Sequence, residues 1–332
     1  MQVEYKPIRD DLQIVISQVG GLATNILKAF KSYIRPNDRL QIVSKTSNKF
    51  DFDDNINTKK ISNSSKYLAN GTFTVVFAIN INGKSGYVLR ITEEPVDKLV
   101  DKYLNIDSKI IPKNLPQIMF YGSISFQKYV WYYTIVPTYR TNFNSLSDPE
   151  KLYFITDLLT LLDILQTNGY VHDDLKLDNV GFDSSVNCIL IDYDANTISP
   201  NASVSELFNA RAYSGSTYVA PYLIANQKNT QSDTFYNKSS AGGLAQVIIS
   251  IYGYNTSWVD TYLSWSQVSE TKGLINTGEF EQLINGHITT IPDSVLTRFI
   301  YYVESNTGLL STHYERVPTY STILNKLNNL NK

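Results

Sequence analysis

The residues best suited to chemistry gather in one short stretch of the chain. Asp174, Lys176 and Asn179 stand close together, and Asp192 follows soon afterwards, at the end of an apolar run. This group supplies a carboxylate that can orient an attacking hydroxyl, a cation, and two side chains with the oxygen donors that Mg²⁺ takes. Phosphoryl transfer needs these groups, since it relies on positioning and charge stabilisation more than on covalent help. The stretch therefore indicates phosphoryl-transfer chemistry.

Two regular elements are expected to hold this stretch in place. Apolar residues recur at helical spacing from Pro149 to Thr167, and Asn168-Gly169 then supplies a left-handed stop. On the other side, Cys188 to Ile191 indicate a buried strand that ends just before Asp192. The reactive stretch is thus a loop between a long helix and a strand, a common place for functional side chains. A solvated acidic turn after the helix is the alternative.

The stretch resembles the catalytic loop and metal-binding strand of eukaryotic-type protein kinases, which read His-Arg-Asp-Leu-Lys-x-x-Asn and then Asp-Phe-Gly. Here the loop is His172-Asp173-Asp174-Leu175-Lys176-Leu177-Asp178-Asn179, and Asp192 follows Asn179 at the family's interval. The resemblance implies that Asp174 orients or accepts the proton of the substrate hydroxyl and that Lys176 contacts the γ-phosphate. It further implies that Asn179 and Asp192 bind Mg²⁺, with ATP as the phosphoryl donor.

An upstream segment is similar to the nucleotide-binding part of the same family. Leu68 to Val76 resemble its glycine-rich loop, with Gly71 at the middle glycine and Ala69 and Thr74 at the other two. Arg90 stands where the family has its phosphate-binding lysine. The resemblance implies that five residues contact ATP: Ala69, Gly71, Thr74, Val76 and Arg90.

These upstream positions depart from the family in ways that bear on ATP binding. Each lost glycine makes a close backbone approach to phosphate harder, and Arg90 presents a broad planar fork in place of a compact ammonium. The helix partner of Arg90 is missing from its usual place, and Asp107 is the nearest candidate. The alternatives are an ordinary strand-turn-strand for the loop and, for Arg90, a surface arginine on an edge strand.

A downstream segment resembles the end of a kinase activation segment. It reads Gly215-Ser216-Thr217-Tyr218-Val219-Ala220-Pro221-Tyr222, in which Tyr222 replaces the usual glutamate; a structural turn is the alternative. Asp173 stands in place of the arginine that would bind an activation-loop phosphate, and Asp194 replaces the glycine after the metal aspartate. We therefore expect that phosphorylation of residues 195–217 is not needed for activity.

Hydrophobic periodicity predicts strands before Pro137 and mainly helices after Pro221. Alternating apolar residues flank Asn82-Gly83, which is a strong signal for a β-hairpin. Gly83-Lys84-Ser85 also resembles the end of a P-loop, but Ala78 stands at the position of the first glycine, which favours the hairpin. Further elements are expected as a helix at Val96–Ser108 and strands at Gln117–Ser123 and Lys128–Val136.

The resemblance and this order of elements predict an α+β chain with a bilobal protein-kinase-like fold. A chain of 332 residues is also long for a single hydrophobic core. We expect an N-terminal extension with a helical segment and a polar linker at 1–65. A small β-rich N-lobe is expected at 66–137, and a larger, mainly helical C-lobe at 138–332.

Composition narrows the range of partners. The formal net charge is −2, which argues against a nucleic acid or an anionic membrane as a partner, because such binders carry a basic excess. The single cysteine, Cys188, is typical of a reducing compartment. The sequence shows neither a signal-peptide pattern nor a run near the ~18 apolar residues of a membrane span. We expect a cytoplasmic protein. Asn, Ile, Lys and Tyr are abundant, as an AT-rich genome would encode, and if that genome is viral the protein would act in the host cytoplasm.

The leading hypothesis is a kinase that transfers the ATP γ-phosphate to Ser or Thr of a protein substrate, because Lys176 follows Asp174 as in the Ser/Thr-directed branch. A pseudokinase scaffold is the second reading, motivated by Arg90 and Tyr222. The third is a small-molecule kinase similar to the aminoglycoside and choline phosphotransferases, which often have an acidic residue where Asp194 stands. Lys176 and the stretch Thr217–Pro221 count against this third reading. The oligomeric state is not indicated by the sequence.

Overall fold

The computed structural model describes most of the second half of the chain and parts of the first half. The chain divides into two compact units, Met1–Thr138 and Tyr139–Lys332. Three expected features lie outside the described residues: the extension 1–65, the helix 96–108 and the segment 195–217. The described residues are 66–70, 74–81, 84–92, 114, 116, 120–126, 129–167, 172, 174–191, 218–225, 238, 240–263, 277–289, 291–292, 301–302 and 307–330.

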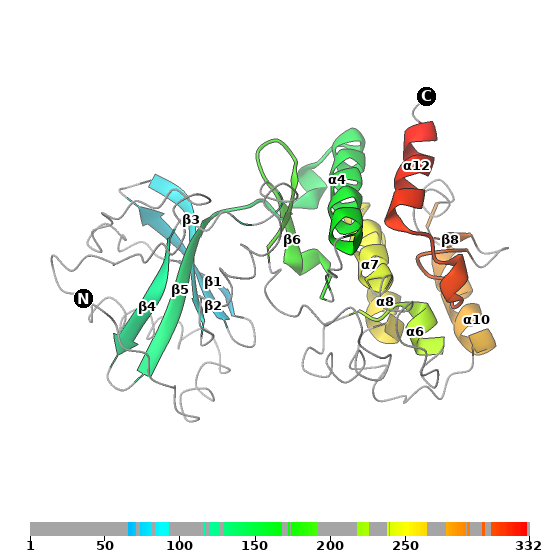
Figure 1. The fold of residues 1–332 in the computed structure, drawn as a ribbon, viewed down its shortest axis with the longest axis horizontal. Helices are drawn as coiled ribbons and strands as arrows, with labels where there is room; N and C mark the ends of the chain where they lie inside the picture. The colour runs from blue at the N-terminus through cyan, green and yellow to red at the C-terminus, as the bar shows by residue number, and fades with distance from the viewer. Residues whose placement is uncertain are drawn as a thin grey trace. The chain divides into compact units, whose positions relative to one another are not determined.

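The described strands of the first unit form one five-stranded antiparallel sheet. Their order is β1-β2-β3-β5-β4, so β3 is the central strand (Figure 1). Valine, isoleucine and aromatic residues are frequent in these strands, as expected for side chains that pack on a pleated surface. The strands are β1 (Lys66–Asn70), β2 (Thr74–Ile81), β3 (Lys84–Thr92), β4 (Phe120–Phe126) and β5 (Tyr129–Pro137).

The pairing of β2 with β3 confirms the predicted hairpin. Ile81 pairs with Lys84 at the closed end, and Asn82-Gly83 between them lies outside the described residues. The P-loop alternative is wrong, because a strand follows Gly83 where a P-loop needs a helix. The strands expected at 117–123 and 128–136 are present as β4 and β5, although β4 begins only at Phe120.

The described part of the second unit is mainly helical, as the sequence predicted for the residues after Pro221. Its described strands form two small antiparallel hairpins, β6–β7 and β8–β9. The described helices are α4 (Asp148–Thr167), α6 (Pro221–Ala225), α7 (Ala241–Ile251), α8 (Ser257–Leu263), α10 (Thr277–Ile288) and α12 (Tyr320–Leu330). The strands are β6 (Val180–Phe182), β7 (Cys188–Leu190), β8 (Tyr301–Tyr302) and β9 (Thr307–Gly308), and the 3-10 turns are η2 (Phe143–Ser145), η3 (Leu177–Asn179) and η7 (Tyr314–Arg316).

Helix α4 is the long helix that the sequence predicted before the reactive stretch. It packs against α12 and β7 (Figure 1). At its N-terminal end an aromatic cluster joins three elements: the ring of Phe143 lies 5.1 Å from that of Phe154 and 5.3 Å from that of Phe182. Asp157, buried in α4, accepts a hydrogen bond of 2.8 Å from the backbone N–H of Cys188. These contacts fix the β6–β7 hairpin on the helix.

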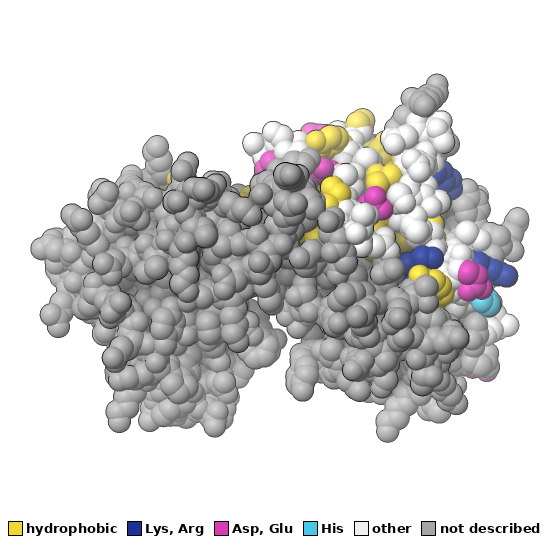
Figure 2. Space-filling view, viewed as in Figure 1, with side chains coloured by type: hydrophobic (Ala, Val, Ile, Leu, Met, Phe, Trp, Pro, Cys, Tyr) yellow, Lys and Arg dark blue, Asp and Glu magenta, His cyan; other side chains and the backbone are white. Residues whose placement is uncertain are grey.

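The described residues combine helices and strands, which confirms the α+β class. None of the described helices is both long and apolar enough to span a membrane. On the described surface of the second unit that Figure 2 colours, hydrophobic side chains are interspersed with polar and charged ones. That face therefore shows no broad hydrophobic patch among the described residues.

Candidate functional site

Three of the predicted site residues meet in the loop after α4. The carboxylate oxygen Oδ2 of Asp174 accepts hydrogen bonds from Lys176 Nζ and from Asn179 Nδ2, each 2.9 Å long. Asn179 Nδ2 also donates to the backbone oxygen of Asp174 at 2.8 Å. Asp174 and Asn179 are buried, with 7% and 6% of their surface exposed. Three of the residues that the sequence singled out are therefore in direct contact, and the roles assigned to them stay predictions.

The hydrogen bonds of Asn179 orient its side-chain amide. Both bonds to Asp174 are donated by the nitrogen Nδ2. The carbonyl oxygen Oδ1 is the other end of the amide, and it is the atom that a hard cation such as Mg²⁺ would bind. Lys176 and Asp174 form an ion pair in which the two side chains are 14% and 10% exposed. The loop thus holds a carboxylate, an ammonium and an amide in fixed contact.

The β6–β7 hairpin brings the end of β7 next to Asn179. The backbone oxygen of Asn179 accepts a hydrogen bond of 2.8 Å from the N–H of Ile191, and Val180 pairs with Leu190 in the strands beyond. Asp192, the second predicted metal ligand, lies outside the described residues. Ile191, which directly precedes Asp192 in the chain, is the last residue of this segment that the structure describes.

The turn of this hairpin is closed by the side chain of Asp183. Its carboxylate accepts hydrogen bonds from the N–H groups of Ser185 and Asn187 and from Asn187 Nδ2, at 2.8 to 2.9 Å. Burial raises the pKa of Asp183, but the hydrogen bonds from Asn187 and Ser185 and the charge of Arg140 outweigh it and lower the pKa below its ordinary value. The bonds also hold Val186 at φ 64°, a conformation that valine rarely adopts.

Arg140 attaches the start of the second unit to the same hairpin. Its backbone N–H and C=O both bond to Phe182, at 2.9 Å each. Its guanidinium lies 4.6 Å from the centre of the Phe182 ring and donates to the backbone oxygen of Asp183 at 2.9 Å. The hairpin that leads to Asp192 is thus fixed from two sides, by α4 and by Arg140.

Helix α7 directly supports the loop that contains Asp174 and Asn179. The hydroxyl of Ser240, at the N-cap of α7, donates to the backbone oxygen of His172. Gly243 lies so close to the loop that an added Cβ would be 2.0 Å from the backbone oxygen of Leu175. One turn further, Gln246 Oε1 accepts a hydrogen bond of 3.1 Å from the N–H of Leu177.

The sequence analysis did not identify Ser240, Gly243 or Gln246. Two signals in the sequence point to Gly243 and Gln246. Gly242-Gly243 in the first turn of an otherwise apolar helix indicates a close backbone approach, and the added Cβ of Gly242 would lie 2.5 Å from the backbone oxygen of Val219. Gln246 is a polar residue within a buried apolar run, and such a residue needs hydrogen-bond partners.

Tyr218 and Tyr222, from the segment that resembles the end of an activation segment, are anchored to the second unit. The Tyr218 hydroxyl donates to Asp260 on α8. Burial, that bond and the charges of Asp260, Asp178 and Asp174 raise the pKa of Tyr218 far above its ordinary value. Tyr222 is fully buried, so an aromatic side chain fills the position where the family has a charged glutamate.

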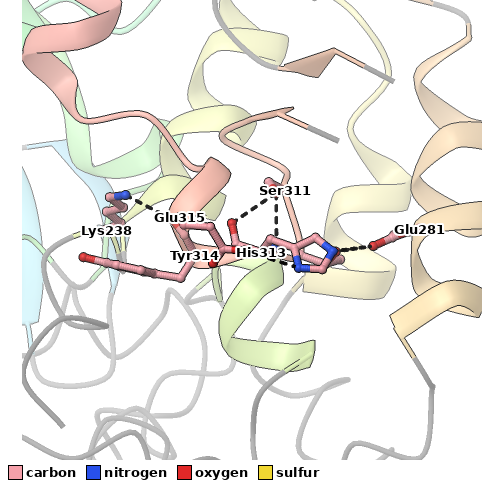
Figure 3. Close-up of polar contacts among 7 residues, drawn as sticks. Lys238, Glu281, Ser311, His313, Tyr314 and Glu315 are labelled. Carbon is pink, nitrogen blue, oxygen red and sulfur yellow. Dashed lines mark hydrogen bonds and ion pairs between the residues drawn. The ribbon is translucent and has the colours of Figure 1, made fainter. Parts of the chain in front are cut away.

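The partner of Tyr222 belongs to a polar cluster near the C-terminus. The ring of Tyr314 lies 5.3 Å from that of Tyr222 at an interplanar angle of 69°, and Lys238 Nζ lies 4.2 Å from the centre of the Tyr314 ring. Figure 3 shows His313 next to Tyr314, with a ring nitrogen directed at Glu281 of α10. That nitrogen is 3.7 Å from the carboxylate of Glu281. The cluster ties η7 to α10 and, through Tyr314, to Tyr222.

Strand register aligns three of the predicted ATP-binding positions in the first unit. Ala69 pairs with Val76, and Val76 pairs with Arg90, which in turn pairs with Thr134 of β5. Residues directly opposite in an antiparallel sheet share a face, so the side chains of Val76, Arg90 and Thr134 lie on one face. The interpretation that Arg90 lies on an edge strand is wrong, because β3 is central.

The other upstream positions are only partly described. Thr74 is the first residue of β2 and pairs with Thr92, whereas Gly71 lies outside the described residues, as does Asp107.

No family model matches the chain, and the search of curated proteins also gave no match. Function is therefore inferred from the residues of this chain alone.

The donor set is compatible with magnesium. Within the part of the chain that the structure describes, no group of three or more His, Cys, Asp or Glu side chains forms a metal site. Mg²⁺ does not need such a group, since it takes one or two protein oxygens and fills its other positions with water and phosphate. The amide oxygen of Asn179 and the carboxylate of Asp192 would suffice.

Proposed function

We propose that this chain is an ATP- and Mg²⁺-dependent kinase of the protein-kinase-like type. One observation carries the proposal: the buried carboxylate of Asp174 is held by both Lys176 and Asn179 in a single loop. A solvated acidic turn, the alternative for this stretch, would leave these side chains exposed and independent of one another. Two side chains converge here on the carboxylate that the proposed reaction needs.

In the proposed reaction Asp174 orients the hydroxyl of the substrate and accepts its proton. Lys176 supplies positive charge beside the carboxylate, at 2.9 Å, and stabilises charge on the transferring phosphate. Asn179 and Asp192 would bind Mg²⁺, which neutralises charge on the phosphates. Ile191, hydrogen-bonded to Asn179, directly precedes Asp192 in the chain.

The first unit is proposed to bind ATP as the small lobe of a bilobal fold. Its support is the register that places Val76 opposite Arg90 on the central strands. Arg90 would contact the phosphates in place of the family's lysine. Because arginine presents a planar fork, the contact would be broader and less compact than that of a lysine.

The substrate is proposed to be Ser or Thr of a protein. Lys176 stands two residues after Asp174, as in the Ser/Thr-directed branch of the family that the chain resembles. Tyr218 and Val219 belong to a segment that resembles the end of an activation segment. Their bonds to Asp260 and Leu263 of α8 give this segment a fixed support.

A phosphotransfer assay with a substrate panel tests the proposal. The purified full chain is incubated with Mg²⁺ and γ-labelled ATP, together with a panel of protein substrates and, separately, aminoglycosides and choline. We expect label on Ser or Thr of proteins and loss of label with Asp192→Ala. Binding of Mg²⁺-ATP without transfer in any reaction would instead indicate a pseudokinase. Label on an aminoalcohol alone would indicate a small-molecule kinase.

A further inference from the structure

Gln246 is an isolated buried amide in an apolar helix. Residues Ala241 to Ile249 of α7 are all buried, and Gln246 itself is 7% exposed. A buried amide is costly unless its hydrogen bonds are made. Here both ends are bonded: Oε1 accepts from the N–H of Leu177 at 3.1 Å, and Nε2 lies 3.1 Å from Ser250 Oγ. The side chain is therefore held in one orientation.

Leu177 is the first residue of η3, the turn that ends at Asn179. The first N–H groups of a helical turn have no partner within the turn and need an outside acceptor. The N-cap residue Lys176 makes no side-chain capping bond, and its own side chain is bonded to Asp174. The acceptor for Leu177 comes from α7, 69 residues away in the sequence.

The η3 turn sets the direction of the Asn179 side-chain amide. The Asn179 N–H closes the turn on the Lys176 oxygen at 3.0 Å, and the Asn179 side chain then reaches Asp174. Any rotation of the turn would move both of these bonds. A bond that fixes the first residue of the turn therefore also fixes the amide at its end.

We propose that Gln246 is a positioning residue for the reaction: its bond to Leu177 holds the η3 turn so that Asn179 is oriented on Asp174. This inference rests on the proposed kinase function. Gln246 acts through Asn179 and contacts neither ATP nor the substrate. Groups that orient a metal ligand in this way typically contribute about 10- to 100-fold to metal affinity or activity.

Three variants of Gln246 and one control test the inference. Gln246→Met keeps the length of the side chain but offers Leu177 no good acceptor. Gln246→Glu keeps an acceptor oxygen, and the Ser250 hydroxyl can donate to the second oxygen. Gln246→Asn keeps the amide but draws it back by one methylene, which gives a milder variant if Gln246→Met does not fold. Ser250→Ala removes only the second bond of Gln246 and is the matched control.

Two readouts separate positioning from a merely structural role. The first is kcat, KM for ATP and the Mg²⁺ concentration for half-maximal rate. The second is amide hydrogen exchange at Leu177 and Asn179, with α12 as the internal reference. For Gln246→Met we expect faster exchange at both amides, a kcat lower by about 10- to 100-fold, a higher Mg²⁺ requirement and little change in KM for ATP. Gln246→Glu should recover most of the rate, and Ser250→Ala should behave like the wild type.

Unchanged kcat and Mg²⁺ requirement in a folded Gln246→Met protein with faster exchange at Leu177 would overturn the inference. So would equal losses in Gln246→Met and Gln246→Glu, because the retained acceptor would then have no effect. If the wild type transfers no phosphate, the kinase proposal fails by itself. The positioning of Asn179 is then decided by exchange alone: faster exchange at Asn179 in the variants supports it, and unchanged exchange overturns it.

Discussion

The close approach of α7 to the catalytic loop makes Gly243→Ala the sharpest single perturbation. The added Cβ would lie 2.0 Å from the backbone oxygen of Leu175, 2.9 Å from its carbonyl carbon and 3.1 Å from its Cβ. Close C···O contacts in proteins are about 3.3 Å or longer, so helix and loop must separate by more than about 1 Å. The obstacle is backbone, which cannot turn aside as a flexible side chain can.

Two effects on stability oppose each other in this variant. Overpacking in a filled core typically costs about 1 to 3 kcal/mol, whereas alanine in place of glycine within a helix gains about 1 kcal/mol. We expect a net loss of up to about 2 kcal/mol in the free energy of unfolding, measured by urea denaturation. Because Leu175 directly follows Asp174, a shift of about 1 Å should also lower the phosphotransfer rate by about 100-fold.

Gly286→Ala is the matched control. Gly286 lies in α10, and an added Cβ there would have no atom within 4 Å. This variant should be as stable as the wild type or up to about 1 kcal/mol more stable, with unchanged activity. Equal stability and equal rate in Gly243→Ala and Gly286→Ala would show that the close contact between Gly243 and Leu175 has no such effect.

The remaining predictions concern the β6–β7 hairpin. Asp183→Asn should lower the melting temperature relative to the wild type at neutral pH. The pKa of Asp183 is lowered in the folded protein, so the difference in melting temperature between wild type and variant is present above the ordinary pKa of 3.8. It should narrow as the pH falls through the lowered pKa. A constant difference across that range would argue against stabilisation by the Asp183 carboxylate. Asp157→Ala leaves the N–H of Cys188 without this acceptor and should cost about 1 to 3 kcal/mol in urea denaturation, whereas Asp157→Asn, which keeps an acceptor oxygen, should cost less.

The elements predicted best from sequence are those set by local signals. Asn82-Gly83 between alternating apolar runs gave the β2–β3 hairpin, and apolar residues at helical spacing gave α4. Strand order is set by pairings distant in sequence, and the edge-strand interpretation of Arg90 failed for that reason. The pairing of β3 with β5, which places Arg90 opposite Thr134, has no local signal.

The residues of the candidate site also divide into those that local sequence indicates and those that depend on packing between distant segments. Asp174, Lys176 and Asn179 are close in sequence, so the motif placed them in one loop, whereas the hydrogen bonds of Lys176 and Asn179 to Asp174 are seen only in the structure. Their supports, Gly243 and Gln246, come from a helix far along the chain, and their contacts depend on how α7 packs. The glycine pair and the buried glutamine are visible in the sequence, but neither indicates which backbone it meets.

The most direct test of the central claim compares two neighbouring aspartates of the catalytic loop. Asp174 is buried and bonded to Lys176 and Asn179, whereas Asp178 is exposed. The initial rate of γ-phosphate transfer is measured for the wild type, Asp174→Asn and Asp178→Asn under saturating Mg²⁺-ATP. We expect a loss of about 10²- to 10⁴-fold for Asp174→Asn and a nearly unchanged rate for Asp178→Asn. Equal rates for the two variants, or a wild type without transfer, would contradict it.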